Sequence, residues 1–290
     1  MPKSPFLILL LLLLHLGAQA APPQILLEVA RFRNLDKVEG GAEVEIYITV
    51  PTQTLTYRQR APKQFQSSAI VTLEVLKANG QSIYKETVTL KPPTLSDTTI
   101  RIKNPVSFLK RINLTEGRYT LRGRVRDQYR AANGETTVEQ PLTIELTSKV
   151  AFLSDIVLLA RPAVKSNGAD TFTRNGYLLT RAPGGLFARG TENLYFYTEL
   201  NQATAGQRVQ LHYHLAAPDG TAADADAPLT AQAGRPTVVV GQLPLGPLPD
   251  GEFTLTIEIR NAAKKLLTTQ TVRGRRDTQE YAPAGAAAPR

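Results

Sequence analysis

Residues 43–50 read Glu-Val-Glu-Ile-Tyr-Ile-Thr-Val, so aliphatic side chains alternate with polar or aromatic ones until Pro51 ends the run. Successive side chains of a β-strand point to opposite faces, and this period of two predicts a strand with one buried face. The alternation recurs over residues 71–75, 119–125 and 142–146. No window of helical length carries an apolar stripe at helical spacing. The best helical candidate is a short turn around residues 106–111, and a loop is the equal alternative there. The sequence therefore predicts an all-β fold.

The second half of the chain repeats the pattern of the first half. Three matches occur in the same order: 45–47 with 195–197, 71–80 with 211–220, and 117–121 with 251–255. Chance agreement between generic strand–turn–strand patterns is the alternative explanation. The preserved order, with offsets that shrink along the chain, favours two copies of one β-domain with different loop lengths.

Short strands separated by turns such as Asn79-Gly80 favour a β-sandwich in each half. The Gly-x-aromatic step that enters a late strand, as at Gly117 and Tyr119, is typical of immunoglobulin-like and fibronectin-type sandwiches. We therefore expect two tandem immunoglobulin/fibronectin-like β-sandwiches, packed in series, over residues 21–148 and 149–276. Residues 277–290 offer few apolar side chains that could be buried, so we expect a disordered Ala/Pro-rich tail there.

Residues 1–20 have the parts of a secretory signal peptide. Lys3 supplies a positive charge, Phe6 to Leu14 are apolar, and Ala18-Gln19-Ala20 is a small-x-small cleavage site. The alternative is an uncleaved membrane anchor, but the apolar run is far shorter than the roughly 20 residues of a spanning helix. We expect cleavage after Ala20, no transmembrane segment in the mature chain, and a periplasmic or secreted protein, with the cell surface as the alternative.

The composition excludes several classes of protein. The 290 residues include 34 Lys+Arg, 25 Asp+Glu, three His and no Cys or Trp, with a net charge of +9. Without Cys there is no disulfide framework, thiolate nucleophile or Cys-ligated metal, and an exported chain of this kind points to a bacterial envelope. The hydrolase, phosphate-loop and zinc-protease motifs are also missing from the sequence. We expect a non-enzymatic protein that uses no cofactor and binds no nucleic acid.

Three further segments suggest a family. They are the strand-like residues 27–33 before the Glu-Ile-Tyr-Ile run, Leu-Ser-Asp-Ile-Val at 153–157, and Leu-Tyr-Phe-Tyr at 194–197. On these segments, residues 24–275 resemble the N-terminal β-rich part of bacterial GWxTD domain-containing proteins. The Gly-Trp-x-Thr-Asp motif itself is absent, as is the family's C-terminal domain. The resemblance implies an exported tandem-sandwich protein and no particular reaction.

A basic stripe is the first candidate binding surface. Arg118, Arg122, Arg124 and Arg126 alternate with Tyr119, Leu121 and Val125, so their side chains project from one face of a strand. Such a row of guanidinium groups could bind an anionic glycan or lipid headgroup. The alternative is that acidic residues on neighbouring strands neutralise the stripe.

Two histidines are the second candidate. His212 and His214 are two residues apart, so their imidazoles share one face of a strand and could hold Zn²⁺ or Cu²⁺ weakly. A metal site normally needs a third protein ligand, and the sequence offers no further histidine after residue 20, so two solvated side chains are the alternative. Asp219, Asp224 and Asp226 crowd the next loop but lack the order of a calcium-binding loop.

Together these observations predict an exported envelope protein that acts as a scaffold or protein-interaction module. The expected partner is another envelope protein, and an acidic glycan or lipopolysaccharide is the alternative ligand. A cryptic hydrolase is the third hypothesis, which a pocket with converging Asp, Glu or His would support. Binding would run through the basic stripe or through the unpaired backbone edges of the sandwiches.

Overall fold

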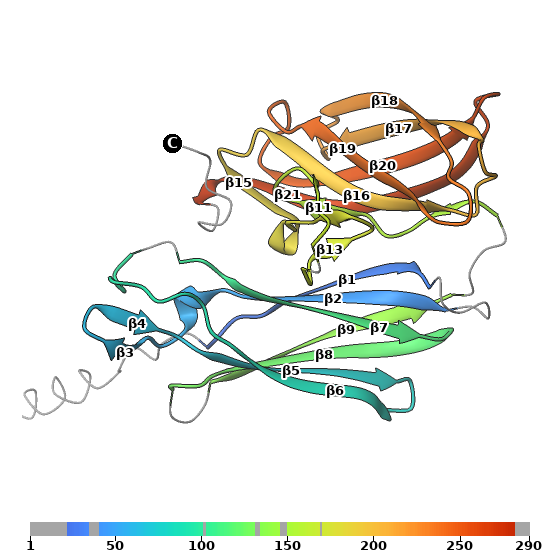
Figure 1. Ribbon diagram of the computed structural model, residues 1–290. Coiled ribbons are helices and arrows are strands. Elements are labelled where there is room, and N and C mark those ends of the chain that lie inside the picture. The colour runs from blue at the N-terminus through green and yellow to red at the C-terminus, as the bar shows by residue number, and fades with distance from the viewer. Residues whose placement is uncertain are drawn as a thin grey trace, which may run out of the picture.

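The computed structural model describes residues 22–34, 41–100, 103–130, 134–145, 150–168 and 170–281 (Figure 1). These residues form strands and two short 3-10 turns, and they include no α-helix. The all-β fold class is therefore confirmed. The predicted signal peptide, residues 1–20, lies outside the described residues. No described segment forms a helix with the length and apolarity needed to cross a bilayer.

The first sandwich extends to Ile144. Its elements are β1 (Leu26–Arg33), β2 (Ala42–Val50), η1 (Thr52–Thr54), β3 (Arg58–Ala61), β4 (Gln64–Gln66), β5 (Ala69–Lys77), β6 (Ser82–Leu90), β7 (Val106–Leu114), β8 (Gly117–Asp127) and β9 (Glu135–Ile144). One sheet has the order β1-β2-β7, the other has the order β6-β5-β8-β9, and β3 and β4 form a small hairpin. The turn expected around residues 106–111 is wrong, because this segment is strand β7 and pairs with the whole of β2.

The second sandwich begins at Phe152. Its elements are β10 (Phe152–Leu153), β11 (Val157–Leu159), β12 (Val164–Lys165), β13 (Thr173–Arg174), β14 (Tyr177–Leu178), η2 (Pro183–Gly185), β15 (Leu186–Arg189), β16 (Asn193–Asn201), β17 (Arg208–Ala216), β18 (Ala222–Thr230), β19 (Thr237–Pro244), β20 (Gly251–Asn261) and β21 (Leu266–Tyr281). One sheet pairs β16 with β10, β11 and β19, and the other has the order β15-β21-β20-β17-β18. Strands β12, β14 and β13 form a separate small sheet.

The two sandwiches share one pattern of strand pairing. The order β6-β5-β8-β9 in the first corresponds to β18-β17-β20-β21 in the second, and β2 between β1 and β7 corresponds to β16 between β10/β11 and β19. The residues matched in the sequence lie on equivalent strands: β2 and β16, β5 and β17, β8 and β20. Strands β12 to β15 have no counterpart in the first copy, and the β3-β4 hairpin has none in the second.

Each sandwich has its own apolar core between its two sheets. Gly117 at the entry to β8 has a φ of +151°, and its counterpart Gly251 at the entry to β20 has a φ of +126°. Only glycine adopts these values readily. Two residues later, the Tyr119 hydroxyl donates to the Thr115 carbonyl at 3.1 Å, which resembles the tyrosine corner of immunoglobulin-like sandwiches. The Gly-x-aromatic step thus marks the same corner in both copies.

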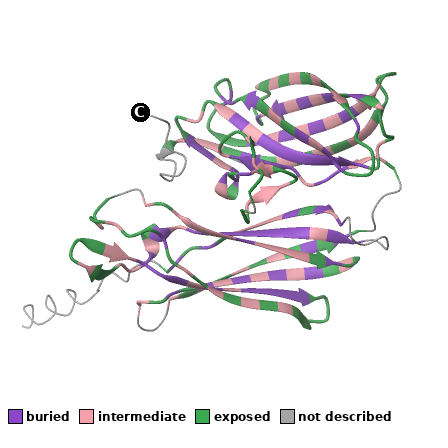
Figure 2. Cartoon of the chain, viewed as in Figure 1, coloured by how far each residue is buried: buried purple, intermediate pink, exposed green. Residues whose placement is uncertain are grey.

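The two sandwiches stack face to face, with β1 and β2 of the first lying below β11, β13 and β16 of the second (Figure 1). The expectation that they pack in series is therefore wrong. Between them lies an apolar cluster of Ala30 and Phe32 from β1 with Val157, Leu159, Leu179 and Tyr197 from the second sandwich. The expectation that β2 buries only one face is also wrong, since the residues from Val44 to Val50 are buried on both faces (Figure 2).

The C-terminal strand runs further than expected. The predicted tail begins at residue 277, but β21 continues to Tyr281 and pairs in parallel with the short strand β15, Ala188 lying opposite Asp277. The carboxylate of Asp250 accepts hydrogen bonds from the backbone N–H and hydroxyl of Thr278, which fixes this extension. The rest of the expected tail, residues 282–290, lies outside the described residues.

Candidate functional site

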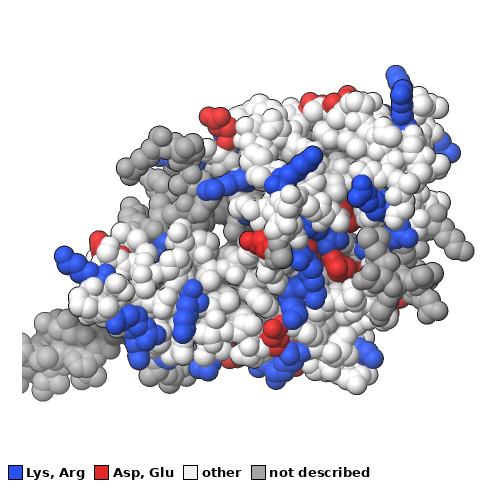
Figure 3. Space-filling view, viewed as in Figure 1, with Lys and Arg blue, Asp and Glu red and all other residues white. Residues whose placement is uncertain are grey.

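Buried charge is concentrated at the junction between the two sandwiches. Glu45 of β2 is 1% exposed and contacts guanidinium groups from Arg111 of β7 at 2.8 Å, Arg174 of β13 at 3.2 Å and Arg181 at 2.5 Å. Arg174 also binds Glu199 of β16 at 2.5 Å. Figure 3 shows basic and acidic side chains together along the line where the sandwiches meet. Residues from both halves of the chain therefore build one ionic network, which we call the junction network.

The junction network shifts the ionisation of its members. Burial would raise the pKa of Glu45, but the three guanidinium groups outweigh burial and lower it. Burial opposes the charge of Arg174, yet the Glu199 and Glu45 carboxylates raise its pKa. The Tyr197 hydroxyl donates to Glu199 at 2.8 Å, and burial together with that carboxylate raises the pKa of the phenol. Glu45 and Arg174 therefore stay charged near pH 7 and Tyr197 stays neutral, and each has a hydrogen-bond or ion-pair partner within the network. Their arrangement is structural.

A second contact joins the sandwiches at the edge strand β1. Arg31 binds Asp155 through two parallel hydrogen bonds, Nε to Oδ2 at 2.8 Å and Nη2 to Oδ1 at 2.9 Å. The backbone N–H of Arg31 also donates to Asp155, and the backbone N–H of Asp155 donates to the Arg31 carbonyl. Paired bonds of this kind fix direction as well as distance. Asp155 therefore holds β1 in register with the second sandwich.

A cavity of about 270 Å³ opens beside this contact, lined by residues of β1, β11, η2 and β21. One lining residue is Glu28, whose Oε2 atom is buried and has no hydrogen-bond partner among the described residues. Burial raises the pKa of Glu28, against the opposing effects of the Gly184 backbone N–H and the charge of Arg181. The cavity wall therefore contains one poorly solvated carboxyl group.

The basic stripe lies on β8, as predicted, in the sheet that faces away from the second sandwich. Neighbouring strands neutralise part of it. Arg122 binds Glu139 of β9 at 2.5 Å, and Arg122 and Arg124 approach Glu74 of β5 at 3.4 and 3.6 Å. Arg118 and Arg126 form no ion pair with another described residue. The stripe is a mixed surface in the middle and a basic one at its ends.

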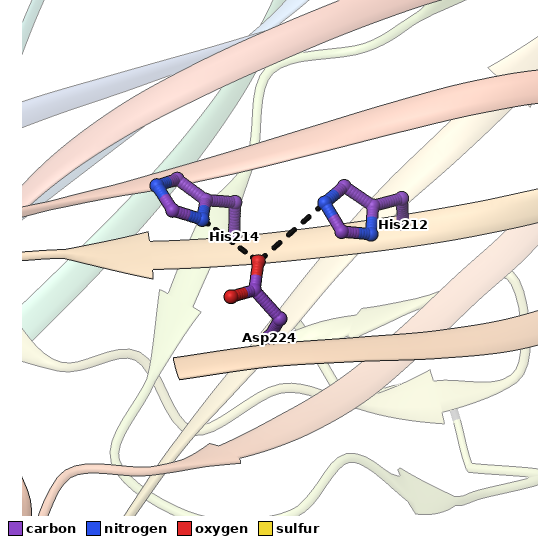
Figure 4. Close-up of side chains that lie close together, drawn as sticks. All are labelled: His212, His214 and Asp224. Carbon is purple, nitrogen blue, oxygen red and sulfur yellow. Dashed lines mark hydrogen bonds and ion pairs between the residues drawn. The ribbon is translucent and has the colours of Figure 1, made fainter. Parts of the chain in front are cut away.

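His212 and His214 project from the exposed face of β17, as predicted (Figure 4). The adjacent strand β18 brings Asp226 opposite His212 and Asp224 opposite His214. Asp224 Oδ1 lies 2.8 Å from His214 Nδ1 and 3.5 Å from His212 Nε2, and Asp226 Oδ1 lies 3.1 Å from His212 Nδ1. One carboxylate thus stands between the two imidazoles.

The loop with three aspartates divides into two parts. Asp219 accepts hydrogen bonds from the backbone N–H and hydroxyl of Thr221, so its carboxylate stabilises the Asp219-Gly220 turn. Asp224 and Asp226 belong to strand β18 and contact the histidines. The three acids do not converge on one point, and a calcium loop is not formed by them.

The junction network was not predicted from the sequence. Its members come from five separate strands and loops. Glu45 and Glu199, together with Glu43, which also pairs with Arg174, occupy polar positions of alternating strands that normally face solvent. The one available signal was the unusual match between the aromatic residues Tyr47 and Tyr197, which lie on those same faces and are both buried.

Comparisons with known proteins give similarity in structure only. No known family matches the sequence, and no curated protein matches it. The resemblance to GWxTD domain-containing proteins therefore stays a prediction.

Among solved structures, the chain is similar to a transglutaminase of red sea bream, with 8% identity and a TM-score of 0.26 over 90% of this chain and 32% of that one. A β-glucuronidase of Bacteroides uniformis is 11% identical, with a TM-score of 0.30 over 84% of this chain and 27% of that one. The fibronectin(III)-like modules of Clostridium thermocellum CbhA are 12% identical, with a TM-score of 0.22 over 82% of this chain and 89% of that one. The chain spans about a third of the transglutaminase and about a quarter of the glucuronidase.

Proposed function

We propose that this protein is a non-enzymatic, exported scaffold of a bacterial envelope that binds another envelope protein. The observation that carries the proposal is the junction network. Its charged side chains pair with one another across the junction and hold two sandwiches in one fixed arrangement. A scaffold needs such a fixed arrangement, because partners bound to each half must keep their separation.

The binding surface of the scaffold is the edge strand β6. It ends its sheet, pairs only with β5 among the described strands, spans nine residues and contains no proline. Unpaired backbone groups along such an edge accept an extended strand from a partner. By contrast, the edge strand β18 contains Pro228, which has no backbone N–H to donate to an added strand.

Photo-cross-linking at β6 tests this function. A photoreactive residue replaces Ile83, which is 38% exposed on β6, and a matched chain carries it at Val164, which is 59% exposed on β12. In the envelope of the native host, we expect one discrete adduct from position 83 and none from position 164. Equal labelling at the two positions, or none at position 83, would contradict the proposal.

The second candidate function is binding of an acidic glycan or lipopolysaccharide at the basic stripe. The observation that favours it is that Arg118 and Arg126 form no ion pair among the described residues, on a chain with a net charge of +9. Long-range attraction of this kind weakens as salt shortens the screening length.

Replacing Arg122, Arg124 and Arg126 together by Gln tests the second candidate. We expect the variant to elute from heparin or lipopolysaccharide resin at lower salt than the parent chain, with an unchanged circular dichroism spectrum. Replacing Arg208, Arg260 and Arg275 of the second sandwich by Gln makes the same change in charge and is the control. Equal elution of the parent and the β8 variant would exclude the stripe.

A further inference from the structure

We propose that His212, His214 and Asp224 form a binding site for one divalent transition-metal cation, Zn²⁺ or Cu²⁺. This site is independent of the scaffold function, because it lies on the outer sheet of the second sandwich and not on β6 or at the junction. The structure supplies what the sequence lacked, a third ligand from a neighbouring strand.

The backbone sets the geometry of the three ligands. The period of two on β17 places both imidazoles on one face, and the register of β18 places Asp224 directly opposite His214. Their ligand atoms all lie within 4.8 Å of one another (Figure 4). Ligand atoms about 2.1 Å from a tetrahedral metal are about 3.4 Å apart. The separation of 3.5 Å between Asp224 Oδ1 and His212 Nε2 is close to that value, whereas the 2.8 Å to His214 Nδ1 is a hydrogen-bond distance that must lengthen by about 0.6 Å when a metal replaces the shared proton.

Asp226 orients one of the ligands. It lies 3.1 Å from Nδ1 of His212, so a ring that binds the metal through Nε2 can donate its Nδ1–H to Asp226. Metal-binding histidines characteristically donate their second ring N–H to a carboxylate in this way. Asp226 is therefore a positioning residue for His212.

The donor set selects the cation. Two imidazoles and one carboxylate suit Zn²⁺ or Cu²⁺, whereas Ca²⁺ and Mg²⁺ prefer sites built from oxygen ligands. Glu258 of β20 lies opposite His212 on its other side and adds negative charge, part of which Arg260 neutralises at 2.5 Å. With three protein ligands, a fourth position stays open to water, as in metal sites that exchange a ligand.

Titration of the full chain with ZnCl₂ by calorimetry, in a buffer that does not coordinate metal, tests the site. We expect one equivalent to bind the parent chain. The His212→Asn/His214→Asn and Asp224→Asn variants should lose this binding, and Asp226→Asn should weaken it about tenfold or more. The remaining histidine, His15, is present in every variant and cancels from the comparison.

Asp219→Asn is the matched control, since it removes one acid from the same hairpin and Asn is also favoured in turns. It should bind Zn²⁺ like the parent chain. The electron paramagnetic resonance spectrum of one equivalent of Cu²⁺ should show coupling to two imidazole nitrogens and lose it in the double histidine variant. Unchanged Zn²⁺ binding in the double variant would overturn the site, and unchanged binding in Asp224→Asn would overturn the three-ligand assignment.

Discussion

At the scale of single residues, two carboxyl groups on adjacent strands have opposite environments. Glu45 is surrounded by three guanidinium groups, which lower its pKa, whereas Glu28 faces the cavity and burial raises its pKa. A buried charge is tolerated where it is paired and costly where it is not. Glu45 therefore stabilises the junction in its ionised form, whereas ionised Glu28 destabilises the folded chain relative to protonated Glu28.

Glu28→Gln should raise the free energy of unfolding at pH 7. The amide keeps an acceptor for Gly184 and removes the cost of a poorly solvated charge. Because the folded-state pKa of Glu28 lies above its unfolded value, that cost is present at neutral pH, decreases as pH falls below the folded pKa and is gone below the unfolded pKa. The advantage of the variant should shrink accordingly in urea titrations at successively lower pH.

Glu252→Gln on β20 is the matched control, since Glu252 is exposed and its loss should change stability by no more than about 0.5 kcal/mol. A Glu28→Gln chain less stable than the parent at pH 7 would show that the carboxylate has a stabilising partner.

At the scale of elements, glycine positions decide how closely strands approach aromatic rings. Gly274 of β21 lies opposite Phe253 of β20, and a Cβ built there would lie 2.4 Å from the ring and 3.0 Å from the Gly185 carbonyl oxygen. The Phe253 ring, 2% exposed, fills the space that a side chain at position 274 would need. The packing of the core therefore requires glycine at position 274.

Gly274→Ala should destabilise the protein by about 1–3 kcal/mol, the usual cost of adding a methyl group to a filled core. Gly246→Ala is the control, because nothing lies within 4 Å of a Cβ there. That change should be neutral or slightly stabilising, since alanine restricts the unfolded chain. Urea denaturation measures both effects, and equal stabilities of the two variants would refute the packing argument.

At the scale of the whole molecule, the junction joins the two sandwiches through apolar and ionic contacts. An apolar cluster and the ionic network bury the faces of β2 and β16 that would otherwise be exposed. Breaking one partner of a buried ionic group costs about 3–5 kcal/mol, because the remaining charges are left uncompensated. The junction is therefore the point at which the two halves can be uncoupled.

Glu45→Gln should uncouple them. We expect the parent chain to unfold in one calorimetric transition and the variant to show two, with the junction weakened by about 3–5 kcal/mol. The enlarged separation of the sandwiches should also raise the radius of gyration in X-ray scattering. Glu252→Gln again serves as the control. A single transition at the parent temperature in Glu45→Gln would show that the apolar cluster alone holds the halves together.

Local patterns in the sequence determined most of the long alternating strands, though not β7, and the repeated corner at Gly117 and Gly251, because alternation and turn chemistry depend on residues a few positions apart. Tertiary structure decided the rest. Glu45 is buried only because the second sandwich covers its face, Glu74 and Glu139 reach the basic stripe only through strand pairing, and Asp224 joins the histidines only through the register of β18. Each of these depends on contacts between residues far apart in the chain, which periodicity along one strand cannot encode.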